Sequence, residues 1–348
     1  MAKLTFVAPM EAKLVSGLPE AAGWQFEPKW DGFRCIGVKQ EGRVDLWAKS
    51  GKPLGRYFPE VLALLDALPG DRIMLDGELI VVIDGAASFD ALQNRLHPAE
   101  SRVRKLSAET PAILVAFDLL HDEDESLLDC PLVERRARLE AYCGRLDPSL
   151  ALRLSPATRD PEIARHWFED LSTELDGVIA KRQDQPYASG ERAMLKIKRI
   201  RSADCVVGGF RYGTGSTEVG SLLLGLYDRE GKLDHVGFTS AIAAKDKPDL
   251  TRKLEKLKGG SGFTGKAPGG PSRWSTERSS EWVKLKPELV VEVLYDQITS
   301  ARFRHGTRLH RWRPDKDPAQ CTFDQLATAA DPDAVISAVV QTASQDHQ

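Results

Sequence analysis

The chain has 348 residues, with 48 lysines and arginines against 51 aspartates and glutamates, and its formal net charge is -3. A chain with a pI near 6.2 does not coat polyanions with its whole surface, so any contact with nucleic acid must come from local basic patches. Its length and its 42% hydrophobic content predict two domains with ordinary cores.

The N-terminus and the cysteines indicate the compartment. Residues 1–10 hold no apolar run of signal-peptide length, and no other stretch is as long and apolar as a membrane span. The five cysteines, none of them at metal-finger or redox spacing, are Cys35, Cys130, Cys143, Cys205 and Cys321. We therefore expect a cytoplasmic protein with reduced, buried thiols and no membrane contact.

The first two hundred residues predict mixed helices and strands. Alternating hydrophobicity predicts a hairpin over 34–39 and 44–48, and helical spacing predicts a helix over 59–68. A second strand pair is expected at 73–75 and 79–83, flanking Asp76-Gly77-Glu78. The other expected elements are helices over 89–96, 132–143 and 161–171, and strands over 113–119, 177–181 and 193–197.

From about residue 203 short strands follow one another, which predicts a small barrel with a domain boundary near 200–203. The expected strands are 204–210, 222–227, 233–238, 282–285 and 289–297. The segment 258–271 is rich in glycine, proline and lysine and predicts a flexible loop. Two interpretations of this loop stay open, an unimportant insertion and a segment that contacts DNA.

A lysine in a turn, Glu27-Pro28-Lys29-Trp30-Asp31-Gly32-Phe33-Arg34, opens a series of charged motifs. The Lys-x-Asp-Gly core is a weak signal by itself, because short motifs recur by chance. Its weight comes from the motifs that follow in order: Asp76-Gly77-Glu78, Phe117-Asp118, Asp176-Gly177 with Lys181, Lys196-Ile197-Lys198 and Arg313-Pro314-Asp315-Lys316. The last two lie in basic stretches.

This ordered series resembles the nucleotidyltransferase motifs of ATP-dependent DNA ligases and messenger RNA capping enzymes. The amino-acid sequences of the segments 27–34, 93–98 and 220–227 are most similar to those of the bacterial LigC-type ligases. The resemblance implies an α+β fold with an antiparallel-sheet nucleotidyltransferase domain over 1–201, an all-β OB-fold domain over 202–330 and a C-terminal tail over 331–348. It also implies a ligase that seals nicks with 3'-hydroxyl and 5'-phosphate ends through a lysyl-AMP intermediate.

The chemistry requires a neutral lysine, because the ammonium form, which dominates at pH 7 for a pKa near 10.4, cannot attack phosphorus. We expect Lys196 and Lys198 to disfavour the ammonium form of Lys29 if they fold over it. Transfer of a phosphoryl group also needs charge neutralisation, which ATP-dependent ligases obtain from Mg²⁺ or Mn²⁺.

The resemblance assigns roles residue by residue. The catalytic residues are Lys29, Asp31, Arg313 and Lys316; those for the nucleotide are Glu27, Arg34, Glu78, Phe117, Ile179, Lys196 and Lys198; those for the metal are Glu78 and Asp176; and those for DNA are Arg34 and Lys49. Phe117 and Ile179 are expected on either face of adenine, and Arg313 and Lys316 at the leaving pyrophosphate. Two positions depart from the family pattern. Asp176 replaces a frequent glutamate, and Lys49 replaces a frequent arginine. The lysine offers a point charge to a phosphate, whereas an arginine would offer a bidentate contact.

The expected partner is nicked double-stranded DNA, bound by a monomer. Lys29 lies so near the start that a separate N-terminal DNA-binding domain is not expected. We therefore expect repair proteins to deliver the nick to this enzyme. We also expect a role in DNA repair near the nucleoid. Two alternatives stay open: an RNA ligase or capping-type guanylyltransferase, and a non-catalytic nick-binding module.

Overall fold

The computed structural model describes residues 3–84, 86–169, 176–269, 281–299 and 301–326, together with Asp333 and Ser337. The chain divides into two compact units, one of Met1–Arg199 with Thr328–Gln348 and one of Ile200–Ala327. The expected helix end at 170–171, the loop end at 270–271 and nearly all of the tail 331–348 lie outside the described residues. No described helix is long and apolar enough to cross a bilayer.

The first unit is built around a seven-stranded sheet with the order β4-β3-β5-β7-β8, to which β6 and β9 are added at β5 and β7. The strands are β3 (Phe33–Gln40), β4 (Arg43–Ala48), β5 (Arg72–Ile83), β6 (Ala86–Ala87), β7 (Ala112–Asp122), β8 (Glu125–Ser126) and β9 (Leu152–Leu154). All pairs are antiparallel except β7 with β9. The predicted hairpin of β3 and β4 is confirmed.

The predicted strand pair around Asp76-Gly77-Glu78 is wrong, because these residues lie inside the single long strand β5. The pairing of β5 with β7 shifts register between Asp76 and Gly77. A Cβ at Gly77 would lie 2.6 Å from the Val115 carbonyl oxygen, so glycine here allows two strands to approach closely. The local Asp-Gly signal therefore marks a bulge.

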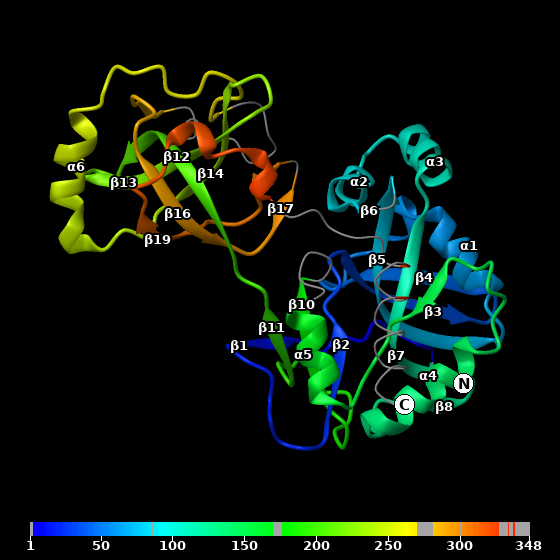
Figure 1. Cartoon of the computed structure of the whole chain (residues 1–348). Coiled ribbons are helices and arrows are strands. Elements are labelled where there is room, and N and C mark those ends of the chain that lie inside the picture. Colours follow the sequence, from blue (N-terminus) through cyan, green and yellow to red (C-terminus); the bar gives the residue numbers. More distant parts are fainter. Residues whose placement is uncertain are drawn as a thin grey trace. The chain divides into compact units, whose positions relative to one another are not determined.

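Helices cover the large sheet, as Figure 1 shows for α1 and α4. The helices of this region are α1 (Pro59–Ala67), α2 (Phe89–Asn94), α3 (Glu100–Glu109) and α4 (Leu132–Cys143), with a 3-10 turn η1 (Gly55–Tyr57) before α1. Helices α1, α2 and α4 contact strands of the sheet, and α3 packs on α1. Helix α3 was not predicted, since Val103 is its only buried residue and a helix with so little apolar periodicity gives a weak pattern. The core between helices and sheet contains Phe58, Leu65, Leu75 and Leu139.

A second, four-stranded sheet has the order β1-β11-β10-β2 and is covered by α5 (Pro161–Glu169). Its strands are β1 (Ala12–Val15), β2 (Trp24–Pro28), β10 (Gly177–Arg182) and β11 (Met194–Lys198). The first and last strands of the unit, β1 and β11, pair in parallel. Strands β2 and β10 are antiparallel with Pro28 opposite Val178, so the end of β2 meets the start of β10.

The second unit is an antiparallel sheet with the order β14-β13-β12-β16-β19, with β15 on β12, a separate ribbon of β17 and β18, and a helix α6 packed on β13. Its strands are β12 (Arg201–Tyr212), β13 (Val219–Tyr227), β14 (Leu233–Thr239), β15 (Val283–Lys284), β16 (Val290–Tyr295), β17 (Ile298–Thr299), β18 (Arg302–Phe303) and β19 (Arg308–Trp312). The helical elements are α6 (Lys247–Glu255) and the 3-10 turns η2 (Ala244–Asp246), η3 (Pro318–Gln320) and η4 (Phe323–Gln325). The α+β unit followed by a β unit is confirmed, with α6 as an unpredicted addition.

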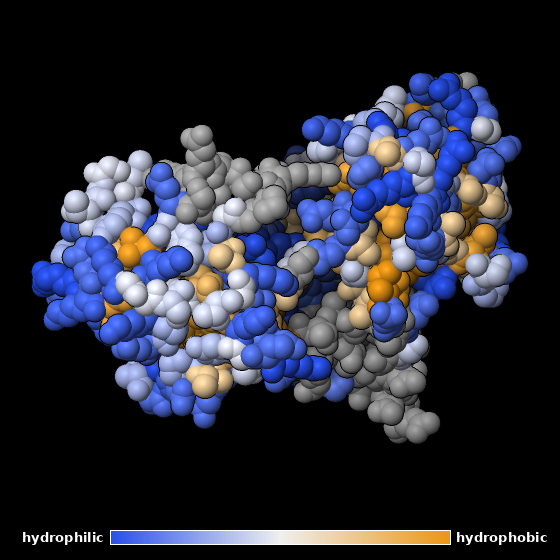
Figure 2. Space-filling view, turned by 90° about the horizontal axis from the view of Figure 1, so that it is seen from above, coloured by the Kyte–Doolittle hydropathy of each residue, from blue (hydrophilic) through white to orange (hydrophobic). Residues whose placement is uncertain are grey.

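Large hydrophobic side chains on the described surface are scattered. The exposed ones are Leu14, Val133, Ile200 and Phe238. In the view of Figure 2 hydrophobic spots are interspersed with hydrophilic residues.

Candidate active site

Lys29 and Asp176 meet at the junction of β2 and β10. The Lys29 Nζ donates to Asp176 Oδ2 at 2.6 Å, and the Lys29 backbone N–H donates to the Gly177 carbonyl oxygen. Gly177 permits this junction, because a Cβ there would lie 2.0 Å from the Ile197 carbonyl oxygen. The structure thus brings together the predicted nucleophile and a predicted metal ligand.

The protonation of Lys29 reflects burial against carboxylates. Burial disfavours its ammonium form, but Asp176, Asp31 and Glu78 outweigh burial and raise the pKa of Lys29 above its usual value. Lys196 has a lowered pKa because of its own burial and the nearby cations. Lys196 and Lys29 repel each other, as predicted, but the hydrogen-bonded Asp176 acts on Lys29 more strongly, so the expected shift toward the neutral amine is not found in this state.

A cavity of about 210 Å³ opens beside Lys29. Its lining includes eight residues predicted from the sequence, namely Glu27, Lys29, Arg34, Lys49, Glu78, Phe117, Ile179 and Lys196, together with the segment 9–12 and Lys181. Asp31 and Asp176 act on Lys29 without being part of this lining. Side chains from both sheets of the first unit thus converge on one cavity.

Glu78 lies in β5 against the turn that follows Lys29. The Gly32 N–H donates to Glu78 Oε1 at 3.2 Å, and a Cβ at Gly32 would lie 2.1 Å from the Leu79 carbonyl oxygen. Burial raises the pKa of the Glu78 carboxyl to about 7, although Arg34 and Lys29 favour its charged form. Glu78 is therefore poised to gain or lose a proton near neutral pH.

Phe117 has two cations at its ring. The Arg34 guanidinium carbon lies 4.4 Å and the Lys181 Nζ 4.8 Å from the ring centroid. The ring is almost buried and lines the cavity. Its stacking on adenine stays a prediction.

Arg34 is held by residues that sequence reasoning did not select. Its Nε and Nη2 donate to the two Asp76 carboxylate oxygens, both at 2.6 Å. Asp76 is fully buried and also accepts from the Tyr187 hydroxyl at 2.6 Å, which in turn accepts from the Met10 N–H. The position of Asp76 two residues before Glu78 was the one available signal, whereas nothing local marks Tyr187.

Two further buried ion pairs support the cavity wall. Glu27 pairs with Lys181 at 2.8 Å and accepts from Gln25, and all three side chains are buried. Arg135, fully buried, donates to both oxygens of Asp118, the residue after Phe117. Lys181 ends the Asp176-Gly177 motif, so its place in the motif could have suggested it.

Lys49 lies at the cavity rim. Its Nζ is 2.8 Å from Glu11 Oε1, and Arg192 approaches the same carboxylate at 3.5 Å. Lys49 and Arg192 are both exposed, so these pairs contribute little stability. The predicted DNA contact of Lys49 stays a prediction.

In the second unit, Arg313 and Lys316 share one carboxylate. Arg313 Nη1 donates to both oxygens of Asp204, at 2.8 and 2.9 Å, and Lys316 Nζ lies 3.2 Å from Asp204 Oδ2. Arg313 also binds Asp315, whose pKa it holds at about 2. Asp204 is another residue that the sequence motifs did not indicate.

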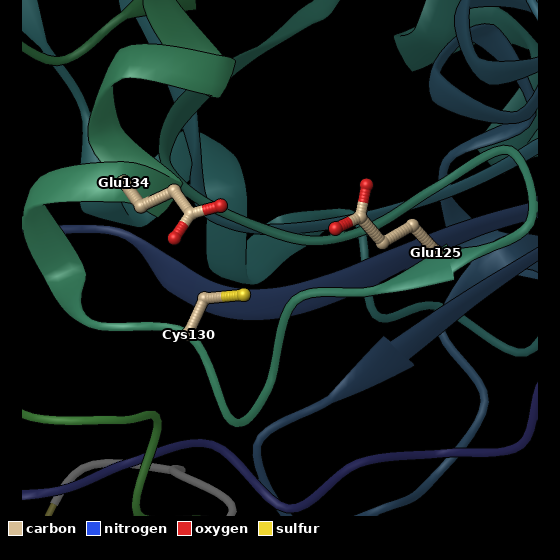
Figure 3. Close-up of side chains that lie close together, drawn as sticks. All are labelled: Glu125, Cys130 and Glu134. Carbon is tan, nitrogen blue, oxygen red and sulfur yellow. The ribbon is translucent and has the colours of Figure 1, made fainter.

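One possible metal-binding group occurs in the described part of the chain. The carboxylates of Glu125 and Glu134 and the thiol of Cys130 lie near one another (Figure 3). Arg138 already pairs with Glu125 at 2.9 Å and with Glu134 at 3.9 Å. The Arg138 guanidinium neutralises both carboxylates, so we assign no metal ion to this group.

Comparisons with known proteins agree with this arrangement. Residues 9–198 match the family described as ATP dependent DNA ligase domain, and residues 215–316 match ATP dependent DNA ligase C terminal region. DNA ligase C of Mycobacterium tuberculosis is 42% identical over 336 residues, which are 92% of this chain and 93% of that protein. A structure of a Lig E DNA ligase has a TM-score of 0.52 at 14% identity and covers 88% of this chain and 100% of its own.

A longer relative is the multifunctional non-homologous end joining protein LigD of Pseudomonas aeruginosa, 32% identical over 328 residues, which are 92% of this chain and 37% of that protein. Both ligase regions match in the order that the motifs predict. The resemblance and the fold class inferred from the sequence are confirmed, and the chain belongs to the ATP-dependent DNA ligases, of the bacterial DNA ligase C type.

Proposed function

We propose that this ligase seals nicks in duplex DNA and that Lys29 carries the AMP. The observation behind the assignment is the Lys29 Nζ beside a cavity whose walls hold basic, acidic and aromatic groups. The neutral amine of Lys29 attacks the α-phosphorus of ATP, so that an N–P bond forms, the P–O bond to pyrophosphate breaks and the amine loses its proton. The 5'-phosphate of the nick then takes the AMP from Lys29, and the 3'-hydroxyl displaces the AMP.

A divalent cation fits the carboxylates around Lys29. Asp176, Glu78 and Asp31 surround the ammonium, and carboxylate oxygens are the donors that Mg²⁺ and Mn²⁺ prefer. We propose that Asp176 and Glu78 hold the ion. Bound there, it would neutralise phosphate charge and compete for the carboxylates that keep Lys29 protonated. Lys29 would then lose its proton more easily, which the nucleophile requires.

The cavity wall favours adenine over guanine. Glu27 offers an acceptor and Lys181 a donor, 2.8 Å apart and next to Phe117. Adenine has an amino donor beside a ring-nitrogen acceptor, whereas guanine has a carbonyl acceptor beside an N–H donor, so the order of the two groups is reversed. Glu27 and Lys181 therefore match adenine and would oppose guanine. Ile179 and Phe117 supply apolar contacts to the base.

Arg313 and Lys316 are proposed to act when pyrophosphate leaves. For this the second unit must approach Lys29 during the reaction with ATP and withdraw before the nick binds. Arg313→Ala and Lys316→Ala should fail to seal an ordinary nick with ATP, yet should seal a nick that already carries a 5'-adenylate at close to the parent rate. Equal loss on both substrates, in a gel assay of each, would contradict this division of labour.

We propose DNA repair as the setting, because relatives that share this ligase region are end-joining proteins. The enzyme would then act in the bacterial cytoplasm near the nucleoid, with repair proteins delivering the nick. Basic patches should bind the DNA with strong salt dependence, and Lys49 and Arg34 are the proposed contacts nearest the cavity.

The proposed function is tested by intact mass after incubation with ATP and Mg²⁺, followed by sealing of a labelled nicked duplex. The parent and Lys39→Arg, a lysine in β3 that binds the Asp66 and Leu68 carbonyl oxygens, should gain one AMP. Lys29→Arg should gain none, because its guanidinium stays protonated. An AMP on Lys29→Arg would refute the assignment, a GMP from GTP would favour a guanylyltransferase, and no adduct on the parent would favour a binding module.

A further inference from the structure

Asp204 holds together the two cations of the Arg313-Pro314-Asp315-Lys316 motif. Both of its carboxylate oxygens are engaged, Oδ1 by Arg313 and Oδ2 by Arg313 and Lys316. The Asp204 side chain is 10% exposed, and Arg313 and Lys316 are also largely covered. Three charged side chains thus form a compact cluster on the sheet of the second unit.

Without Arg313 and Lys316, the Asp204 carboxylate would destabilise the sheet of the second unit. In the register of β12 and β16, Asp204 lies directly opposite Glu292, and like charges in opposite positions destabilise a sheet. Glu292 is paired with Arg311 at 2.6 Å, and Asp204 is paired with Arg313, two residues further along. Each carboxylate therefore has its own arginine, but Asp204 alone has the motif lysine as well.

Asp315 does not replace Asp204 in this cluster. It binds Arg313 from the same short segment, and its side chain is 62% exposed, so solvent screens it. Among the described residues, the ion pairs of Lys316 include Asp204 and no other carboxylate. Asp204 is thus the group that links the two cations.

We propose that Asp204 is a positioning residue for the reaction with ATP, which keeps Arg313 and Lys316 side by side so that they meet pyrophosphate as an ordered pair. Without the shared carboxylate the two cations repel each other, and each long side chain regains rotamer freedom that it must lose again on binding. Cations that are ordered in advance stabilise developing charge better than mobile ones. This inference rests on the proposed roles of Lys29, Arg313 and Lys316.

The test is Asp204→Asn, which keeps the shape of the side chain and removes its charge. Three quantities are measured: the rate of AMP transfer from ATP to the protein, the pyrophosphate concentration that half-maximally releases AMP from the adenylated protein, and the rate of sealing of a 5'-adenylated nick. Release of AMP by pyrophosphate is the reverse of adenylation, since a pyrophosphate oxygen attacks the phosphorus, the N–P bond to Lys29 breaks, the lysine nitrogen regains a proton and ATP forms. Glu292→Gln, which removes the opposite carboxylate, is the matched control.

Asp204→Asn should slow adenylation about tenfold and raise the half-maximal pyrophosphate concentration about tenfold, while sealing of the adenylated nick stays within about twofold of the parent. Asp204→Glu should recover part of the loss, and Glu292→Gln should match the parent in all three assays. Asp204→Asn behaving like Glu292→Gln would overturn the inference. So would a lower half-maximal pyrophosphate concentration, because Asp204 would then compete with pyrophosphate, and so would equal loss on the adenylated nick. A parent without any adduct would overturn the proposed function itself.

Discussion

Glu78 should make the stability of the metal-free protein fall as the pH rises from about 5 to 8. Burial raises the pKa of its carboxyl to about 7 from a usual 4.5. A carboxyl with a higher pKa in the folded than in the unfolded chain binds a proton on folding. Its contribution is therefore complete below pH 4.5 and is lost as the pH rises through 7. The two pKa values correspond to roughly a 300-fold ratio of proton affinities, or roughly 3 kcal/mol, and because Glu78 is only half-buried this is an upper bound.

The assay compares the parent with Glu78→Gln in urea unfolding at pH 5, 6, 7 and 8 with a chelator present, followed by tryptophan fluorescence. The amide cannot ionise, so the free energy of unfolding of the parent relative to Glu78→Gln should fall across this range. Mg²⁺ should reverse the trend, because the ion binds only the charged carboxylate. Parallel curves for the two proteins would refute the raised pKa, and a parent that gains stability with pH would mean that Arg34 and Lys29 dominate over burial.

Three other substitutions test the support of the cavity and of the fold. Tyr187→Phe removes the hydroxyl that donates to Asp76, the residue that holds Arg34 in the cavity wall. The Michaelis constant for ATP in adenylation should rise about tenfold, while the melting temperature falls by only a few degrees. An unchanged Michaelis constant would show that Tyr187 does not position the residues of the cavity. Arg95→Met leaves Glu60 without its buried partner and should lower the free energy of unfolding in urea by about 3 kcal/mol, and a loss below about 1 kcal/mol would contradict the burial argument. Phe117→Leu keeps an apolar side chain but no ring, so a filter-binding assay should give weaker ATP binding with folding intact, and unchanged affinity would contradict stacking.

The motifs predicted eight of the residues that line the cavity, but they did not predict the segment 9–12. Phe117 lies in the apolar run 113–119, which was predicted as a strand and belongs to β7, so its chemistry and its secondary structure were both visible in the sequence. The continuity of β5 was not, because pairing with β3 and β7 overrides the local turn signal of Asp76-Gly77.

The supporting ion pairs could not be predicted for a different reason. Asp204 is 109 residues from Arg313, and Tyr187 is 111 residues from Asp76, so only the folded chain brings them together. The protonation of Lys29 likewise depends on its 2.6 Å contact with Asp176, which competes with burial and with more distant cations. A sequence shows which charges exist, whereas the sign of their net effect needs distances.

The parallel pairing of β1 with β11 has a consequence for synthesis on the ribosome. Strand β1 (Ala12–Val15) emerges long before its partner β11 (Met194–Lys198), which is the last described strand of the first unit in chain order. Because residues 9–12 and Lys196 both line the cavity, its wall stays incomplete in any nascent chain that has not yet released β11. Closing so long a loop also delays folding, since contacts distant in sequence form late. The nascent chain should therefore begin to bind ATP only after β11 has emerged and paired with β1, so that nucleotide binding reports a completed cavity wall.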